Sequence, residues 1–222
     1  MSVSPESLFH YSVSFPFNEQ PAHDDRELRT KGFIFSFKRY SRINPGIETL
    51  LQRAVEACVH GITQSDFIHV EVIPVVEAAF DVVQVYPFTF TAFAMQGFTC
   101  NLTENCMGGD FVHLYVPLTA DDTAKGVEFL SQMQGWDYHY WAAIKAMFNK
   151  ETENEHHEQH HNRRRAKRVF CSEAALLMCK HVGIYQGDTR PSQCMPQHLF
   201  DLIARLPSAR IVQNIEPVHG LN

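Results

Sequence analysis

The 222-residue chain lacks an apolar run long enough to cross a membrane, and it lacks a basic start followed by an apolar segment. The first absence excludes a transmembrane helix, and the second argues against a secretory signal peptide. Positive charge is also scarce, because 19 Lys and Arg stand against 25 Asp and Glu, for a net charge of -6. A nucleic-acid binder with a basic surface is therefore not expected. These absences predict a soluble, intracellular protein, cytoplasmic unless it is imported into the nucleus.

No internal repeat is visible, and 45% of the residues are hydrophobic, which is enough to bury one sizeable core. Strand-like and helix-like patterns occur in clusters rather than in strict alternation, which favours an α+β fold with an antiparallel sheet. The chain divides into an N-terminal arm (1–31), a main domain (32–206) and a C-terminal tail (207–222). Strands are expected near 32–38, 67–73, 79–86, 88–94 and 111–117. Helices are expected near 44–58, 120–134, 138–148, 172–182 and 196–206.

A cysteine stands where the sequence predicts the start of a helix. Phe170 before it is an extended-type apolar residue, Glu173 falls in the first turn, and Gly183 provides a stop after an Ala/Leu-rich stretch. The unpaired N–H groups and the positive end of the dipole at a helix start favour a thiolate over a thiol. Cys171 is therefore a candidate nucleophile, although a small buried hydrophobe would give the same pattern.

A histidine lies in a strand-like segment well upstream of this cysteine. Residues 65–73 are rich in apolar and β-branched side chains between Gly61 and Pro74, so they predict a strand in which His69 and Glu71 point to one face. An imidazole there could accept the thiol proton of Cys171, with Glu71 as a nearby carboxylate. The alternative is a histidine satisfied at the edge of a sheet.

These two segments, in this order, resemble the permuted papain-like amidases of the YaeF/YiiX group, relatives of lecithin retinol acyltransferase. Residues 69–72 read His-Val-Glu-Val and residues 170–173 read Phe-Cys-Ser-Glu, close to the family's histidine strand and cysteine helix. The histidine strand precedes the cysteine helix, the reverse of papain. The resemblance covers about residues 32–206 and implies a circularly permuted papain-like fold, with an antiparallel sheet packed with helices and a catalytic cysteine at a helix N-terminus.

The resemblance also implies a third polar residue that orients the imidazole, on the strand after the histidine strand. Asp81 and Gln84 are the polar residues of the expected strand 79–86, and they face opposite sides because their separation is odd. Gln84, just before a short run that contains proline, matches the family position best. Glu71 and Asp81 remain alternatives that would supply a negative charge.

The oxyanion formed by thiol attack needs hydrogen-bond donors. The backbone N–H of Cys171 at the helix start could provide one. The resemblance places Tyr138 near the cleft as a second candidate, in the stretch 135–138 that stands in place of the family's Gly-x-x-Tyr-Asp turn. An aromatic residue at this place could equally serve packing.

Residues 149–168 are charged and almost without apolar side chains, which predicts a solvated insertion before the candidate helix. The histidines at 156, 157, 160 and 161 would lie one turn apart if helical and could hold a divalent ion. A pattern for nuclear import is carried by Arg163, Arg164, Arg165, Lys167 and Arg168. A plain solvated loop is the third interpretation.

The six cysteines are expected to be free thiols in an intracellular chain. Cys100 and Cys106 lack the spacing of a zinc knuckle, so we assign no metal and no cofactor to the candidate site. The sequence predicts a cysteine hydrolase or acyltransferase that forms an acyl-enzyme on a peptide-type amide or a lipid acyl substrate. The alternatives are an inactive papain-like binding module and a nuclear or metal-binding interaction protein that uses residues 149–168.

Overall fold

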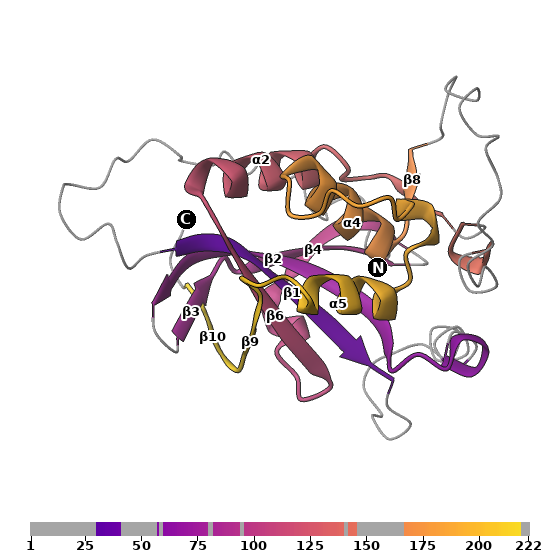
Figure 1. Cartoon of the computed structure of the whole chain (residues 1–222), viewed down its shortest axis with the longest axis horizontal. Helices are drawn as coiled ribbons and strands as arrows, with labels where there is room; N and C mark the ends of the chain where they lie inside the picture. Colours follow the sequence, from indigo (N-terminus) through magenta and orange to yellow (C-terminus); the bar gives the residue numbers. More distant parts are fainter. Residues whose placement is uncertain are drawn as a thin grey trace, which may run out of the picture.

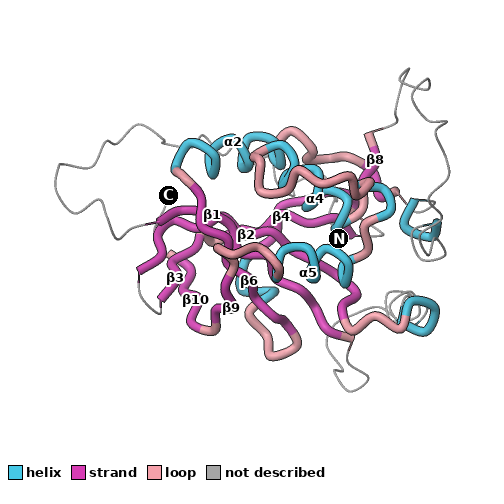
Figure 2. The backbone as a smooth tube through the Cα atoms, viewed as in Figure 1, coloured by secondary structure: helices cyan, strands magenta, loops and turns pink. Residues whose placement is uncertain are grey.

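A mostly antiparallel sheet forms the centre of the protein, as Figures 1 and 2 show for the computed structural model. The structure describes residues 30–40, 57, 60–79, 82–93, 96–139, 142–145 and 167–218. The main strand order is β10, β3, β2, β1, β6, β9, and β4 pairs with both β2 and β5. Pairing is antiparallel except between β10 and β3 and in the small β7–β8 sheet. The α+β class predicted from the sequence is confirmed.

The strands are β1 (Thr30–Arg39), β2 (Phe67–Ala79), β3 (Val82–Val85), β4 (Phe88–Phe93), β5 (Gly97–Leu102), β6 (Phe111–Leu118), β7 (Asp137–Tyr138), β8 (Arg168–Val169), β9 (Arg210–Val212) and β10 (Asn214–Pro217). The α-helices are α2 (Ala120–Ser131), α4 (Cys171–His181) and α5 (Pro196–Ala204). Two 3-10 turns are η2 (Thr103–Cys106) and η3 (Pro191–Gln193).

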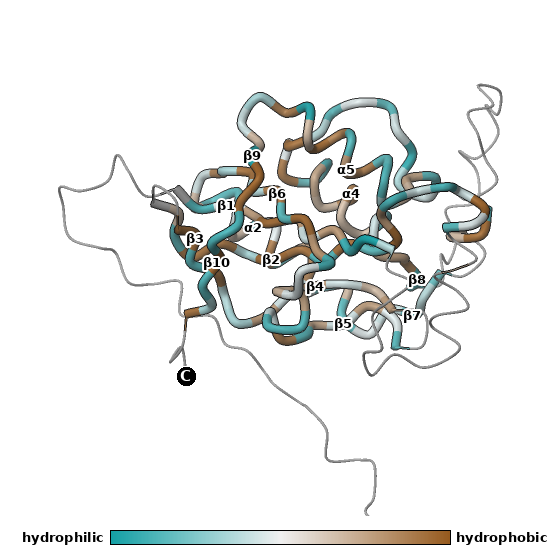
Figure 3. Tube along the Cα trace, turned by 90° about the horizontal axis from the view of Figure 1, so that it is seen from below, coloured by the Kyte–Doolittle hydropathy of each residue, from teal (hydrophilic) through white to brown (hydrophobic). Residues whose placement is uncertain are grey.

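β1 lies between β2 and β6 and is buried on both faces. Phe33, Phe35 and Phe37 alternate along it and pack into the core that α2, α4 and α5 share with the sheet. Ile34 and Ser36 point to the opposite face and are equally buried. Side chains alternate between faces with a period of two in a strand, so five consecutive buried residues require layers on both sides. Figure 3 shows the hydrophobic stretches of this central region between the helices and the outer strands.

The helix-side core is the larger of the two. Each helix contributes apolar side chains to it: Val127 and Leu130 in α2, Leu176 and Met178 in α4, and Leu199 and Ile203 in α5. Burying a side chain of this size stabilises the fold by about 1.5–3 kcal/mol relative to leaving it exposed. The smaller core on the other face contains Ile34, Ile73 and Tyr115. The sheet is thus fixed from both sides around β1 and β2, and β2 carries His69.

Thr119 caps α2, and its loss should be measurable. Its hydroxyl accepts a hydrogen bond from the backbone N–H of Asp122 at 3.1 Å. We expect Thr119→Ala to lower the free energy of unfolding by about 1 kcal/mol, because one N–H at the helix start loses its acceptor. Urea unfolding followed by circular dichroism measures this change. Thr119→Ser keeps the acceptor, so an equal loss in both variants would contradict the capping role.

Two differences from the expected organisation concern the ends of the sheet. The predicted C-terminal tail is part of the sheet, because β9 pairs with β6 and β10 pairs with β3. Strands of three and four residues have too little pattern of their own, and their neighbours decide whether they form. β5, β7 and β8 were also not expected, and β2 extends to Ala79, beyond the predicted end at 73. The arm up to residue 29 and nearly all of the helix expected at 44–58 lie outside the described residues.

Candidate active site

Cys171 is the first residue of α4, as the sequence predicts. Phe170 before it is extended, and the N–H of Ala174 donates to the carbonyl of Phe170 at 3.0 Å to begin the helical ladder. The carboxylate of Glu173 accepts the N–H of Phe170 at 3.4 Å, and the hydroxyl of Ser172 donates to the carbonyl of Cys194 at 2.6 Å. These contacts fix the helix start, so the thiol lies at the positive end of the helix dipole.

His69 lies where β2 and β4 separate. The two strands have a single register pair, Val72 with Phe90. On either side of this pair, the hydroxyls of Thr89 and Thr91 donate to the carbonyls of Val72 and Val70, at 3.2 and 3.0 Å. Side chains of β4 therefore satisfy carbonyls of β2 that a regular ladder would satisfy with backbone N–H groups.

The thiol of Cys171 contacts the same side of β2 as the hydroxyl of Thr91. In an antiparallel strand, the N–H and C=O of one residue point to the same side. The N–H and the C=O of Val70 thus point to the same side of β2. The C=O accepts the hydroxyl of Thr91, and the N–H donates to the sulfur of Cys171. The backbone of Val70 therefore contacts both the thiol of Cys171 and the hydroxyl of Thr91.

Cys171 and His69 form a hydrogen-bonded pair that favours separated charges. Burial opposes the thiolate, but the charge and hydrogen bond of His69 and the N–H groups of Val70 and Ser172 lower the pKa of the Cys171 thiol from its ordinary 9.0. Burial likewise opposes protonation of His69, but interactions with Cys171 and with Glu71 raise its pKa from 6.5 to about 10. Between these two pKa values the pair is a thiolate and an imidazolium.

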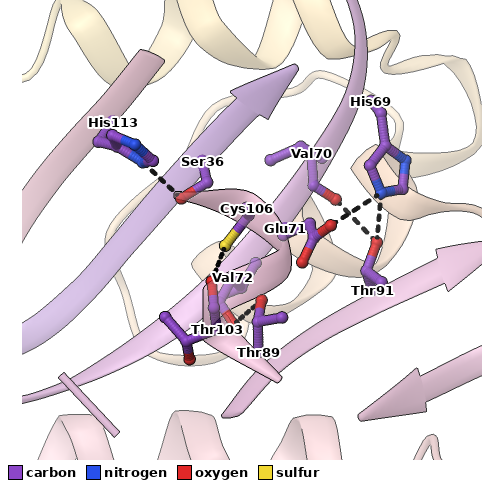
Figure 4. Close-up of polar contacts among 10 residues, drawn as sticks. All are labelled: Ser36, His69, Val70, Glu71, Val72, Thr89, Thr91, Thr103, Cys106 and His113. Carbon is purple, nitrogen blue, oxygen red and sulfur yellow. Dashed lines mark hydrogen bonds and ion pairs between the residues drawn. The ribbon is translucent and has the colours of Figure 1, made fainter. Parts of the chain in front are cut away.

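Two further groups face the Nε2 atom of His69 (Figure 4). The hydroxyl oxygen of Thr91 lies 3.0 Å from Nε2. The carboxylate oxygen Oε1 of Glu71 lies 3.7 Å away, too far for a strong hydrogen bond but close enough for charge attraction. Phe93 stacks on the imidazole, with ring centroids 4.8 Å apart. The ring is therefore restrained in its plane and at one nitrogen.

Glu71 is only 4% exposed and is surrounded by small polar groups. It pairs in register with Ser36 of β1, whose hydroxyl lies 2.8 Å from the Nδ1 of His113 on β6. The thiol of Cys106 in η2 approaches Glu71 from another element and donates to the carbonyl of Thr103 at 3.1 Å. Burial raises the pKa of Cys106, and the charge of Glu71 raises it further, so this thiol stays protonated. Figure 4 shows how these side chains surround the carboxylate.

The placement of Gln84 corrects the prediction that it orients the imidazole. Gln84 is exposed on β3 and pairs with Glu77 of β2 and Glu216 of β10. Glu77 lies eight residues beyond His69, a separation of about 26 Å along a strand. The physical reason is that β2 continues to Ala79, so that β3 pairs with the part of β2 beyond Pro74, away from His69. Asp81, another alternative for this role, lies outside the described residues.

Tyr138 is placed in β7, which pairs with β8 just before α4. Its ring packs against the small cluster of Ala142, Ala143 and Phe170. The N–H groups that reach the sulfur of Cys171 come from Val70 and Ser172. The ring of Tyr138 thus takes part in packing, and its role toward an oxyanion stays a prediction.

The remaining described cysteines differ from Cys171 in chemistry. None of the five described cysteines, Cys171 included, forms a disulfide, in agreement with the predicted free thiols. Burial raises the pKa of Cys100 to about 11 and that of Cys194 to about 12, and it raises that of Cys179 as well. Among the cysteines that the structure describes, Cys171 has the only lowered pKa, which singles it out as the thiolate.

The charged insertion lies mostly outside the described residues, including the four histidines proposed as metal ligands and the arginines at 163–165. Arg168 belongs to β8, with its Nε 3.9 Å from a carboxylate oxygen of Asp137. Within the part of the chain that the structure describes, no three His, Cys, Asp or Glu side chains are grouped to hold a metal ion. In that same part, none of the helices is long and apolar enough to span a membrane.

Thr91 is the site residue that the sequence interpretation missed. Residues 88–93 read Phe-Thr-Phe-Thr-Ala-Phe, an alternation that predicts a strand with threonines on one face. Thr89 and Thr91 are both buried in the structure. A threonine side chain at a buried position needs a hydrogen-bond partner, and this was the available signal. The partner could not be named because the sequence does not show that β4 meets β2.

The comparisons with protein families and with curated proteins found no relative of this chain. No protein-family model matches the chain, and no curated protein matches it significantly.

Proposed function

We propose that this chain is a cysteine hydrolase or acyltransferase with a circularly permuted papain-like arrangement. The observation that carries the proposal is the Cys171–His69 pair, in which the thiol pKa is lowered and the imidazole pKa is raised. Such a pair is what nucleophilic catalysis at neutral pH requires. The order of the elements supports the permuted arrangement, because the strand of His69 precedes the helix of Cys171 and both belong to one sheet-and-helix unit.

The proposed reaction begins with attack of the Cys171 thiolate on the carbonyl carbon of an amide or ester. A carbon–sulfur bond forms, and the electron pair of the carbonyl moves to its oxygen. The imidazolium of His69 then gives its proton to the departing amine or alcohol as the carbonyl re-forms. The products of this first half-reaction are the released amine or alcohol, a thioester on Cys171 and a neutral imidazole on His69.

The second half restores the enzyme. His69 removes a proton from water, or from another acceptor such as an alcohol or amine, and the acceptor attacks the thioester. The carbon–sulfur bond breaks, and Cys171 leaves as a thiolate beside an imidazolium. Water as acceptor gives a hydrolase, and an alcohol or amine gives an acyltransferase. Peptide-type amides and lipid acyl groups both contain the required carbonyl.

The start of α4 supplies the electrostatic support for the oxyanion. The first backbone N–H groups of a helix have no acceptor within the helix. One of them is the N–H of Cys171, which lies beside the thiol of the same residue. Cys171 is 6% exposed, so the carbonyl would be attacked in a shielded environment where such dipoles act strongly.

The test is the pH dependence of iodoacetamide alkylation, measured for each cysteine by mass spectrometry. We expect Cys171 to react at a lower pH than the other described cysteines, because its thiol pKa is lowered from 9.0 and theirs are raised. Cys100 and Cys194 should stay unreactive below about pH 10, because their thiol pKa values are about 11 and 12. If Cys171 reacts no faster than these two at pH 7, the proposed enzyme is contradicted.

A second measurement follows the acyl-enzyme itself. Incubation with activated acyl thioesters and nitrophenyl esters of several chain lengths should add one acyl group, which mass spectrometry would locate on Cys171. The adduct should be absent in Cys171→Ala. Cys179→Ala is the matched control, because Cys179 lies on the same helix, is buried and has a raised pKa. Labelling of Cys179 in place of Cys171 would rule the mechanism out.

A further inference from the structure

Two side chains face the Nε2 atom of His69, namely Thr91 from β4 and Glu71 from the strand of His69 itself. We propose that Thr91 sets the orientation and tautomer of His69, while Glu71 supplies the negative charge that stabilises its imidazolium. This inference rests on the proposed function, because it names the residues that position its proton carrier. In this division neither residue touches the substrate, so both are positioning residues.

The direction of the Thr91 hydrogen bonds follows from counting protons. A hydroxyl has one proton, and that of Thr91 is donated to the carbonyl of Val70 at 3.0 Å, since a carbonyl can only accept. The oxygen of Thr91 must therefore accept at its 3.0 Å contact with the Nε2 of His69. Nε2 then carries the proton in the neutral ring, and Nδ1 has the lone pair that takes the proton of Cys171.

The carboxylate of Glu71 is placed to act through charge. Its Oε1 lies 3.7 Å from Nε2, while Nε2 already has a closer partner in Thr91. Its Oε2 is buried and makes no hydrogen bond of ordinary geometry. A buried carboxylate with so few hydrogen bonds is costly unless a positive charge lies next to it. The imidazolium of His69 is that charge.

The other groups around the pair do not replace Glu71. Facing His69 are Cys171 from α4, Thr91 and Phe93 from β4, and Glu71 from its own strand. Facing Glu71 on its other sides are Ser36 of β1, which holds His113, and the thiol of Cys106 in η2. Burial lowers the pKa of His113, so this ring is neutral. Glu71 is thus the nearest described negative charge to His69 apart from Cys171 itself.

The experiment uses the full-length Cys171→Ala protein, in which His69 titrates without the thiol. Nitrogen-15 NMR of labelled histidine gives the pKa of His69 and shows which nitrogen is protonated in the neutral ring. His69→Ala in the same background assigns its signals. The added variants are Thr91→Val, Thr91→Ala, Thr91→Ser and Glu71→Gln. The matched controls are Thr89→Val, whose hydroxyl bonds to Val72 instead, and Glu77→Gln, far along the same strand.

Two separate effects are expected. Thr91→Val and Thr91→Ala should change the single Nε2–H tautomer into a mixture, and Thr91→Ser should restore it, because serine keeps the hydroxyl. Glu71→Gln should lower the pKa of His69 by at least about one unit, a tenfold change in its proton affinity, while the tautomer stays the same. Thr89→Val and Glu77→Gln should change neither quantity.

Either of two results overturns the division of roles. One is a single unchanged tautomer in whichever of Thr91→Val and Thr91→Ala remains folded by circular dichroism. The other is a His69 pKa in Glu71→Gln that equals the pKa in Glu77→Gln. Since the titration is done without the thiol, these results would leave the reactivity of Cys171 standing. An unreactive Cys171 in the parent would instead overturn the proposed function, whatever the titration gives.

Discussion

Replacing His69 with alanine should lower the alkylation rate of Cys171 at pH 7 by roughly 10- to 100-fold. Burial alone raises the pKa of this thiol, and His69 is the largest of the opposing influences. Without the imidazole, the pKa should return to its ordinary 9.0 or above, so that at most about one thiol in a hundred is ionised at pH 7. The measurement is the rate of iodoacetamide labelling of Cys171 between pH 5 and pH 10.

The control for this prediction is His113→Ala. His113 is also a partly buried histidine of the central sheet, but its Nδ1 bonds to Ser36 and not to the thiol. Its removal should leave the reactivity of Cys171 within about twofold of the parent. Equal losses in both variants would mean that the rate reports damage to the sheet. No loss in His69→Ala would show that the helix start alone ionises the thiol.

The largest effect on stability is expected from Gly32→Ala. Gly32 has a φ of 148°, outside the range that residues with a side chain adopt readily, and a Cβ there would overlap the backbone carbonyl of Val116. β1 pairs with β2 and β6, so neither neighbour can withdraw without breaking its own ladder. We expect the free energy of unfolding to fall by about 3 kcal/mol or more, measured by urea unfolding.

Gly61→Ala is the matched control for this substitution. A Cβ at Gly61 meets nothing within 4 Å, and its φ is not positive. Gly61 is helical and exposed, so alanine should leave the stability unchanged or raise it by up to about 1 kcal/mol. A Gly32→Ala protein as stable as the Gly61→Ala protein would show that β1 can shift, contrary to its position between two paired strands.

Local patterns in the sequence were enough to predict the two elements that carry His69 and Cys171. The strand of His69 and the helix of Cys171 are both confirmed, because each has an apolar pattern together with clear boundaries. The short strands β9 and β10 were missed, since three or four residues carry little pattern and depend on the strands beside them. The α+β class was predictable because it depends on the longer elements.

The partners of the imidazole were harder to predict than the imidazole itself. Gln84 was favoured on the assumption that the next strand in the chain lies beside His69. The long β2 instead carries β3 to the other end of the sheet, and β4 returns to His69 with Thr91. Glu71 was available as an alternative, because residues two positions apart on a strand, such as His69 and Glu71, point to the same face. The contact within β2 was thus visible in the sequence, and the contact of β4 with β2 was not.

The backbone of Val70 joins the thiol to the threonine, which has a consequence for how this site can change over time. Its N–H meets the sulfur of Cys171 and its C=O meets the hydroxyl of Thr91. Every non-proline residue offers the same two groups, so these two contacts do not require one particular side chain at position 70. Descendants of this chain could therefore exchange much of their surrounding sequence and still preserve the distances on which the proposed chemistry depends.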